Sequence, residues 1–390
     1  MKILVVCQHY YPEPFRITDI CEELVKMGHT VSVVTGLPNY PMGTLYPGYE
    51  SRAKRREEIN GVDVHRCFTI PRKTGVIRRV LNYFSFAISS SRYVRKLDAD
   101  YDVVFVNQLS PVMMANSGVK YKKKHGTRLV LYCLDLWPES LTVGGIKKGS
   151  VAYKIFHKVS RKIYSSADRL LITSKSFAKY FEKEFGINNT EYLPQYAEAL
   201  FDPETCKKEE NGYIDLMFAG NVGAAQSVDT IIRAAKLTED IPNLRWHIVG
   251  EGSELNNCRA LAEELSAKSV IFHGRHPIEE MPRFYAMADA MLVTMQKNPI
   301  VSLTLPGKVQ TYMAAGKPII GAIDGETALV IDEAKCGLCA PAEDHEALAN
   351  AARCFVSCTN ADYAKNSLNY YDRKFVKNGF FESLLKVFEG

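Results

Sequence analysis

Residues 214–223 read Ile214-Asp215-Leu216-Met217-Phe218-Ala219-Gly220-Asn221-Val222-Gly223, an apolar run that passes directly into a glycine loop. The run has the length of one strand, and a helical pattern follows the loop at 228–237. A second apolar run at 244–249 then leads into Gly250-Glu251-Gly252. Strand, glycine turn and helix in this order predict βαβ units with parallel strands.

The same alternation extends along the 390 residues in both directions. It occupies residues 3–185, and a weakly patterned segment at 186–212 precedes the second series. One hydrophobic core rarely serves a chain of this length. We therefore predict an α/β fold with two Rossmann-like parallel-sheet domains, over 1–195 and 196–370, that face a central cleft.

The composition indicates a folded chain without a membrane span. Hydrophobic residues make up 46% and charged residues 24%, unlike a disordered protein. No apolar run reaches the roughly 18 residues that span a bilayer. Residues 1–8 resemble a first strand and lack the features of a signal peptide. Ten cysteines without such a signal indicate reduced thiols, so we expect a cytoplasmic protein.

Charge is divided unevenly between the two halves. Residues 1–195 hold 30 Lys and Arg against 17 Asp and Glu, a net charge of +13, whereas the remaining residues hold 19 against 27, a net charge of −8. A basic half favours a membrane surface, a nucleic acid or a phosphorylated substrate as its partner. Because no nucleic-acid-binding motif accompanies the charge, we do not expect nucleic acid.

Two patterns could suggest metal sites. Cys336-x2-Cys339 and Cys354-x3-Cys358 loosely resemble four-thiolate zinc spacing, and Asp98-x-Asp100-x-Asp102 resembles a metal-binding carboxylate motif. We interpret the cysteines as residues of a buried strand and a helix face, and the carboxylates as a solvated helix end. No metal or other cofactor is expected.

Residues 305–318 carry the most specific candidate for anion binding. Pro306 can end a loop, so that a helix begins near Lys308 and closes at Gly316. A lysine in the first turn of a helix could place its ammonium on a diphosphate, and the glycine loops at 219–223 and 250–252 could let the backbone approach the same group. A solvated lysine on an amphipathic helix is the alternative.

The chain resembles the family 4 glycosyltransferases of the GT-B fold over nearly its whole length. The matching segments include Tyr11-Pro12-Glu13, Leu37-Pro38-Asn39-Tyr40-Pro41, Asp135-Leu136-Trp137-Pro138-Glu139 and Tyr312-Met313-Ala314-Ala315-Gly316-Lys317-Pro318. The second and third of these are most similar to bacterial enzymes of O-antigen, capsule or exopolysaccharide synthesis, including amino-sugar transferases.

The resemblance implies transfer of a sugar from a nucleotide-diphosphate sugar, expected to be UDP-linked, to a lipid-linked glycan. It further implies retention of configuration and a polyprenyl-diphosphate-linked acceptor. We expect activity without metal, because protein cations and helix N-termini are predicted to neutralise the diphosphate. The family fold also implies that a C-terminal helix, residues 371–390, crosses back to the first domain. The sugar, the acceptor glycan and the oligomeric state are left open by the sequence.

The donor site departs from the family pattern. Family members often carry Glu-x7-Glu, whose positions here are Leu303 and Thr311, and an Arg and a Lys where this chain has Asn221 and Gln226. We therefore expect Lys308 to carry most of the positive charge at the donor. The complete predicted donor set is Gly220, Asn221, Gln226, Gly250, Glu251, Arg275, Leu305, Pro306, Lys308 and Thr311.

Acceptor residues are predicted in the first half. Asp135 follows a strand at its carboxyl end, where a carboxylate could orient an acceptor hydroxyl or take its proton, and Glu139 could share that task. A turn-capping role for Asp135 is the alternative. Arg16 and Tyr11, in the loop after the first strand, are predicted to contact the acceptor or its phosphates.

A basic segment precedes and enters the helix predicted at 77–97. Its cations are Arg52, Lys54, Arg55, Arg56, Arg72, Lys73, Arg78 and Arg79. Phe84 and Phe86 follow them within the helix. Arginines beside aromatic rings suit an anionic membrane surface, so we predict Arg78, Arg79, Phe84 and Phe86 as a peripheral contact with the inner face of the cell membrane. The alternative is that both rings pack in the core.

Two other functional classes stay open. A nucleotide-sugar epimerase can share this architecture, although no His and Glu acid–base set is evident. A non-catalytic subunit would explain the absence of acids at Leu303 and Thr311.

Overall fold

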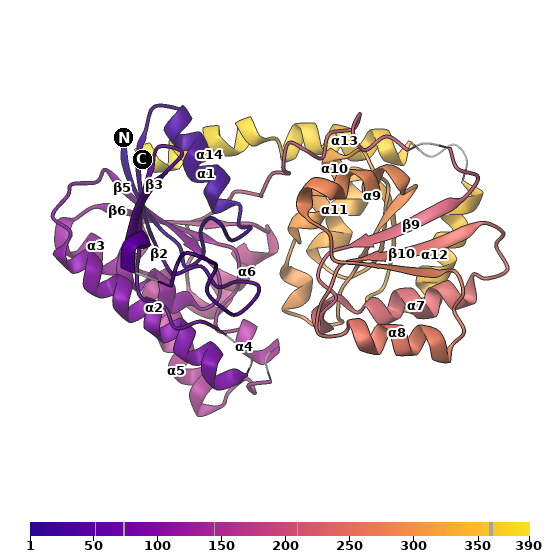
Figure 1. Ribbon diagram of the computed structural model, residues 1–390, viewed down its shortest axis with the longest axis horizontal. Helices are drawn as coiled ribbons and strands as arrows, with labels where there is room; N and C mark the ends of the chain where they lie inside the picture. Colours follow the sequence, from indigo (N-terminus) through magenta and orange to yellow (C-terminus); the bar gives the residue numbers. More distant parts are fainter. Residues whose placement is uncertain (51, 73–74, 144, 209, 359–361) are drawn as a thin grey trace. The chain divides into compact units, whose positions relative to one another are not determined.

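The computed structural model describes residues 1–390 except 51, 73–74, 144, 209 and 359–361. The chain forms two compact units (Figure 1). Unit 1 comprises Met1–Thr173, Phe177–Tyr192 and Leu384–Gly390, and unit 2 comprises Ser174–Ser176 and Leu193–Ser383. The expected boundaries were 195/196 and 370/371, whereas the units divide at 192/193 and 383/384.

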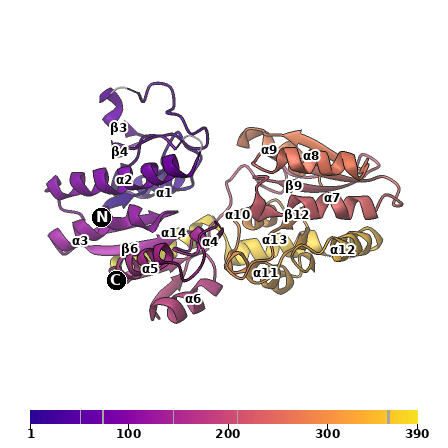
Figure 2. The ribbon, with the colours of Figure 1, turned by 90° about the horizontal axis from the view of Figure 1, so that it is seen from below.

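Unit 1 is built on an eight-stranded sheet in the order β3-β4-β2-β1-β5-β6-β7-β8. All neighbours pair in parallel except β3 and β4, which are antiparallel at one edge. Figure 2 labels β3 and β4 next to each other. The strands are β1 (Lys2–Val6), β2 (Thr30–Thr35), β3 (Arg56–Ile59), β4 (Val62–Arg66), β5 (Val103–Gln108), β6 (Arg128–Cys133), β7 (Arg169–Ile172) and β8 (Thr190–Tyr192). The central strand β5 is buried throughout, as a strand covered on both faces must be.

Helices cover both faces of this sheet (Figure 1). They are α1 (Ile17–Lys26), α2 (Val76–Lys96), α3 (Asn116–His125), α4 (Ser140–Val143), α5 (Val151–Tyr164) and α6 (Ser176–Phe185), with the short 3₁₀ turn η2 (Val112–Ala115) before α3. The turn η2 contacts α2, α3 and α5, so these elements form one layer. The end of α14 (Lys377–Glu389) also belongs to unit 1, where Phe388 packs edge-on against Phe105.

Unit 2 contains a six-stranded, fully parallel sheet in the order β11-β10-β9-β12-β13-β14. Its strands are β9 (Ile214–Ala219), β10 (Leu244–Val249), β11 (Val270–Gly274), β12 (Ala290–Thr294), β13 (Ile319–Ala322) and β14 (Gly337–Ala340). Its helices are α7 (Val228–Leu237), α8 (Leu255–Glu264), α9 (Met281–Met287), α10 (Gly307–Ala314), α11 (Glu326–Ala334), α12 (His345–Ser357) and α13 (Tyr363–Lys374).

The strands of unit 2 supply alternate residues to two cores. In β9, Met217 and Ala219 join the core beneath α9, α10, α11 and α13, whereas Leu216 and Phe218 join the core beneath α7, α8 and α12. This period of two explains why nearly every residue of β9 is apolar: both faces of the strand are covered. The predicted α/β architecture with two parallel-sheet domains is confirmed.

Candidate functional site

The candidate donor site lies at the carboxyl edge of the unit 2 sheet. The chain leaves β9 toward β10 on one side, whereas β12 lies on the other side of β9. Ligands of doubly wound sheets bind beyond the strand ends where the strand order reverses in this way. The loop after β9 contains Gly220, and the chain after β12 runs to Lys308 at the start of α10.

Glycine is required where the loops of this edge touch. The N–H of Gly250 donates to the carbonyl of Gly274 over 2.7 Å, and that of Val222 donates to the carbonyl of Glu251 over 2.8 Å. A Cβ at Gly250 would lie 1.8 Å from the carbonyl oxygen of Gly220, and one at Gly252 would lie 2.1 Å from that of Val222. No larger residue fits either position, so the glycines fix the three loops against one another.

Lys308 reaches the loop after β9 from the first turn of α10. Its ammonium lies 3.9 Å from the centroid of the Phe218 ring, and a Cβ on Gly220 would come within 2.7 Å of Nζ. Burial lowers the pKa of Lys308 to about 7. No carboxylate among the described residues pairs with it, and burial is the sole cause of the shift. A cation that the fold desolvates without a counter-charge is suited to bind an anion.

The other predicted donor residues fall into two groups. Asn221 and Gln226 lie together, with the Asn221 amide donating to Oε1 of Gln226 over 3.2 Å, and Arg275 and Glu251 are exposed on neighbouring loops. Pro306 is the residue directly before α10. These positions, with Gly220 and Gly250, remain candidates for donor contact.

Two predicted donor residues need correction. The Leu305 side chain is a member of the core beneath α10, and the Thr311 side chain is buried, with its hydroxyl donating to the carbonyl of Gly307 over 3.1 Å. Neither side chain faces solvent, because the start of α10 packs the face that carries them against the sheet. They support the loop that carries Lys308 and do not present a side chain to a ligand.

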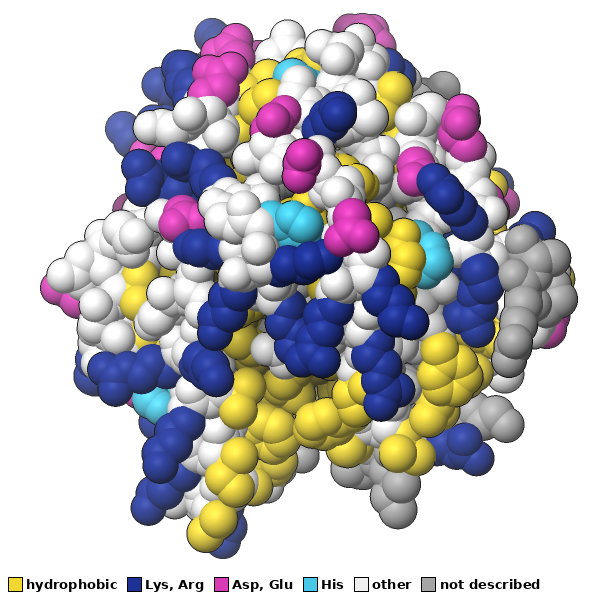
Figure 3. Space-filling view, turned by 90° about the vertical axis from the view of Figure 1, so that its left-hand side faces the viewer, with side chains coloured by type: hydrophobic (Ala, Val, Ile, Leu, Met, Phe, Trp, Pro, Cys, Tyr) yellow, Lys and Arg dark blue, Asp and Glu magenta, His cyan; other side chains and the backbone are white. Residues whose placement is uncertain are grey.

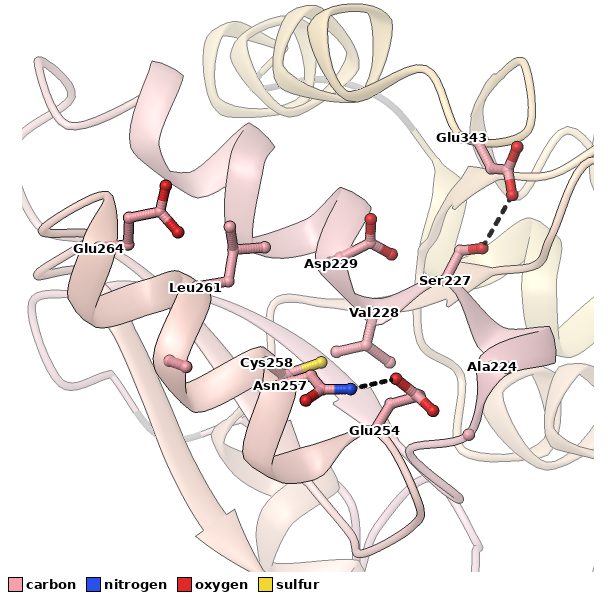
Figure 4. A pocket seen from close by; sticks show the side chains of 12 residues that line it. Ala224, Ser227, Val228, Asp229, Glu254, Asn257, Cys258, Leu261, Glu264 and Glu343 are labelled. Carbon is pink, nitrogen blue, oxygen red and sulfur yellow. Dashed lines mark hydrogen bonds between the residues drawn. The ribbon is translucent and has the colours of Figure 1, made fainter.

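A separate cavity of about 570 Å³ lies between α7 and α8 (Figure 4). Its lining includes Asp229, Glu254, Glu264 and Glu343. The Asn257 amide donates to Glu254 over 2.8 Å, and the Ser227 hydroxyl donates to Glu343 over 3.4 Å. The four carboxylates of this cavity would repel a diphosphate. A diphosphate is therefore better suited to the opposite side of the glycine loops, where Lys308 lies.

Asp135, predicted as an acceptor residue of unit 1, has a side chain that two hydroxyls hold in place. It follows β6, and its two carboxylate oxygens accept hydrogen bonds from the Ser110 and Ser140 hydroxyls, the second over 2.7 Å. Burial raises the pKa of Asp135 above its ordinary value, although these hydroxyls act in the opposite direction. The side chain is thus held in one orientation and still partly exposed, as binding of an acceptor hydroxyl would require.

Glu139 is not available to share that task. It is fully buried, and its Oε1 accepts from the Tyr153 hydroxyl over 2.8 Å, from Lys148 Nζ over 3.2 Å and from the Tyr180 hydroxyl over 3.4 Å. The carboxylate therefore ties α5 and α6 to the segment after β6. The prediction of a catalytic Glu139 is wrong for this reason.

The loop after β1 contains a site that the sequence analysis missed. Glu13 is buried and accepts four hydrogen bonds, from His9 Nδ1 over 3.0 Å and from the backbone N–H groups of Tyr10, Asn39 and Tyr40 over 2.7–3.2 Å. His9 stacks on Phe15. The signal was present in the two matched segments that contain Glu13 and Asn39, but their mutual contact is not visible in sequence.

Tyr11 and Arg16 flank this site. Tyr11 is about half exposed, and its carbonyl accepts from the buried Arg66 guanidinium over 2.6 Å. Arg16 directly precedes α1 and is partly buried. Both residues therefore lie at the carboxyl edge of the unit 1 sheet, and their contact with the acceptor stays a prediction.

The predicted membrane residues divide between surface and core. Arg78 and Arg79 are exposed, and Phe84 is 40% exposed, but Phe86 is fully buried. Phe86 packs against the sheet because α2 turns this face inward with Asn82 and Ser90, so its assignment to a membrane contact is wrong. Lys73 lies outside the described residues. Figure 3 shows Lys and Arg side chains bordering an apolar band on this side of the molecule.

The described part of the chain shows neither a cluster of metal ligands nor a membrane-spanning helix. Among the described residues, no three His, Cys, Asp or Glu side chains converge as metal ligands would. No helix in the described part of the chain combines the length and apolarity of a membrane span.

Known protein families and curated relatives match both units. Residues 15–194 match the glycosyl transferase 4-like domain, and residues 214–357 match the glycosyl transferases group 1. A probable glycosyltransferase of Pseudomonas aeruginosa, WbjE, is 26% identical over 73% of this chain and 74% of its own. A putative colanic acid biosynthesis glycosyl transferase of Escherichia coli, WcaI, is 27% identical over 81% and 82%.

Solved structures share the fold at lower identity. Sucrose-phosphate synthase from Thermosynechococcus elongatus has a TM-score of 0.76 at 16% identity, covering 100% of this chain and 98% of its own. Anabaena HepE, solved in complex with UDP, has a TM-score of 0.75 at 14% identity and covers 100% of both chains.

Proposed function

Because this chain belongs to the family 4 glycosyltransferases with the GT-B fold, we propose that it transfers a sugar from a UDP-sugar to a lipid-linked glycan in the synthesis of a bacterial surface polysaccharide. Binding of the sugar donor is supported above all by Lys308. This desolvated and unpaired cation lies beside Gly220, where the strand order of the unit 2 sheet reverses.

The donor diphosphate would lie between Lys308 and the loop after β9. The N–H groups of Asn221 and Gly223 have no acceptor among the described residues, and neither do those of Gly307 and Lys308 at the start of α10. These donors and one ammonium would neutralise phosphate charge without metal. Arg275, exposed and without an ion-pair partner in the described part of the chain, is proposed as a second cation.

The acceptor would bind at the carboxyl edge of the unit 1 sheet. Asp135 would accept a hydrogen bond from the attacking hydroxyl, since the Ser110 and Ser140 hydroxyls hold its carboxylate in place. Tyr11 and Arg16 would contact the acceptor or its diphosphate. Retention of configuration and the hexose or amino-sugar class of the donor belong to this proposal and are supported by family membership alone.

A lipid-linked acceptor would require the enzyme to work at the inner face of the cell membrane. The exposed cations Arg78 and Arg79, beside the half-exposed Phe84, support peripheral attachment there. Each cation near an anionic leaflet contributes about 1 kcal/mol, so attachment would be reversible and sensitive to salt.

A panel of nucleotide sugars with a polyprenyl-diphosphate-linked acceptor tests the proposal. We expect transfer from one UDP-sugar, detected as a mass increase of the lipid-linked product, and activity that persists in EDTA. Interconversion of the free nucleotide sugar without transfer would instead identify an epimerase. Absence of UDP binding would identify a non-catalytic protein.

A further inference from the structure

We propose that the groove between α2 and α3 is a discrete site for the phosphate headgroup of an anionic phospholipid. The proposal deepens the membrane association proposed above and rests on it for its physiological setting. Nothing in it depends on the donor site of unit 2.

The groove is a cavity of about 190 Å³ in the outer layer of unit 1. Helix α2 contributes apolar side chains at one end and Arg92 and Arg95 at the other, and α3 contributes Lys120. Met113 of η2 also lines it. An apolar end beside a cationic end matches an amphiphile better than a fully hydrated ion.

The cations of the groove have no counter-charge from the protein. Arg92, Arg95 and Lys120 form no ion pair with any described residue. Burial and the neighbouring Arg95 charge both lower the pKa of Lys120. Like charges held together without an acid favour binding of an anion between them, because the anion removes their mutual repulsion.

A buried hydroxyl provides an independent indication of a polar ligand. Ser91 lines the groove and is 2% exposed, and its Oγ has no hydrogen-bond partner among the described residues. Leaving a buried hydroxyl unpaired costs about 1–3 kcal/mol. A phosphate oxygen held by Arg92, Arg95 or Lys120 could accept the Ser91 hydrogen bond and recover that cost.

The apolar end of the groove continues along α2 as an exposed stripe. Val80, Phe84 and Ile88 are 44%, 40% and 47% exposed and follow one another at spacings of four residues, on one face of the helix. A headgroup in the groove would therefore place its acyl chains along this stripe. Free phosphate would leave the stripe in water, which is why we infer a lipid.

The surrounding layer has the charge that a lipid surface requires. Helices α2, α3 and α5 together contain thirteen Lys and Arg residues and no Asp or Glu. On α5, Val151 and Ile155 are exposed as well. Figure 3 shows this combination, cations around an apolar band. A purely electrostatic surface would not need the band.

Short-chain lipids below their micelle concentration test the site without a bilayer. We expect saturable one-to-one binding of dihexanoyl phosphatidylglycerol, none of dihexanoyl phosphatidylcholine, and clearly weaker binding of inorganic phosphate. Binding of phosphate as tight as that of phosphatidylglycerol would show a free-anion site and overturn the proposal. Tighter binding of a single-stranded oligonucleotide, or no saturable lipid binding, would overturn it too.

Two triple variants with the same change in charge distinguish lipid binding in the groove from general attraction by the positive charge of the surface. Arg92→Gln/Arg95→Gln/Lys120→Gln should weaken phosphatidylglycerol binding at least tenfold, the loss expected for one charge-assisted hydrogen bond or more. The matched control, Lys154→Gln/Lys158→Gln/Lys162→Gln on α5, should change it less than threefold. Equal losses would refute a discrete site. Ser91→Ala, with intact thermal unfolding, should weaken lipid binding severalfold, and unchanged binding would contradict the role of its hydroxyl.

Vesicle co-sedimentation and UDP binding can fail independently, so a failure of the groove proposal can be distinguished from a failure of the proposed function. If vesicles containing phosphatidylglycerol fail to bind the protein, peripheral membrane attachment is refuted, whereas the short-chain titration still decides the groove. If UDP binding or transfer fails while the groove variants behave as expected, only the glycosyltransferase proposal is refuted.

Discussion

Replacing Lys308 with methionine removes the charge that the proposed donor site depends on while keeping a similar side-chain length. The ammonium lies over the Phe218 ring and beside Gly220, with no carboxylate among the described residues to neutralise it. A diphosphate would therefore be its principal electrostatic partner. The variant should lose one charge-assisted hydrogen bond, about 1.5–3 kcal/mol of UDP binding, or roughly 10- to 150-fold in Kd.

The pH dependence of binding follows from the same lysine. In the unliganded protein its pKa is lowered to about 7, from an ordinary 10.5. A bound diphosphate stabilises the ammonium and raises that pKa, so UDP binding takes up a proton. The affinity should then fall as the pH rises above 7, by up to about tenfold per pH unit, until the pKa of the complex is reached. The Lys308→Met variant should lack this dependence.

Folding stability should depend on pH in the opposite direction to UDP affinity, and should rise as the pH rises above 7. Between pH 7 and 10.5 the unfolded chain binds more protons at this lysine than the folded chain does, so the lysine makes stability rise with pH through that window. Below pH 7 its full destabilising effect is present. The Lys308→Met variant should therefore have a higher Tm than the wild type at pH 7 in the absence of UDP.

Isothermal titration calorimetry from pH 6.5 to 9, in buffers of different ionisation enthalpy, measures both the affinity and the proton uptake. Lys317→Met is the matched control, because burial also lowers the pKa of this lysine of unit 2, but its ammonium donates to the carbonyl of Ala288 over 2.9 Å. The control should lower stability and leave the affinity for UDP unchanged. The reasoning is refuted if Lys308→Met binds UDP as tightly as wild type does, or if binding takes up no proton at pH 8.

Three further substitutions test other residues of the two units. Asp135→Asn should retain UDP binding and lower kcat at least 100-fold, because a neutral amide cannot accept the acceptor proton; kcat within threefold of wild type would exclude the assigned role. Gly250→Ala should impair folding or UDP binding, since its Cβ would meet the Gly220 carbonyl oxygen at 1.8 Å. The control Gly126→Ala should keep UDP affinity, because Gly126 also has a positive φ but no atom lies within 4 Å of the added Cβ. Glu139→Ala should lower stability by about 3–5 kcal/mol through loss of its buried partners, measured by urea unfolding, with no change in UDP affinity.

The architecture could be predicted from the sequence because the strands of both sheets are apolar runs that short-range sequence patterns reveal. Apolar runs such as 214–219 are buried on both faces, and the glycines at 220 and 250 follow strands directly. Lys308 could also be placed, because Pro306 and Gly316 define the start and end of its helix. Such features depend on neighbours within a few residues of the chain.

The misplaced residues depend on distant partners. Glu139 is buried by Lys148, Tyr153 and Tyr180, the last of them 41 residues away. Phe84 and Phe86 are only two residues apart in an apolar stretch, so nothing local decides which of the two turns toward the sheet. The Glu13 site needs the loop at 39–40, which only the parallel pairing of β1 with β2 brings near.

The pKa shifts show how differently the fold treats the charges of Lys308, Asp135 and Asp215. Burial lowers the pKa of Lys308 and raises that of Asp135, so the fold disfavours the charged form of both. Asp215, by contrast, is buried among His247, Arg245 and Asn211, and their hydrogen bonds hold its pKa well below the ordinary value even though burial acts in the opposite direction. A fold can neutralise a buried charge internally, as at Asp215, and then that charge has little to gain from a ligand. A charge left uncompensated gains most when a ligand of opposite sign or a proton donor arrives. Leu303 and Thr311 stand where the family pattern has acids, so neither position supplies a carboxylate that a diphosphate would have to displace.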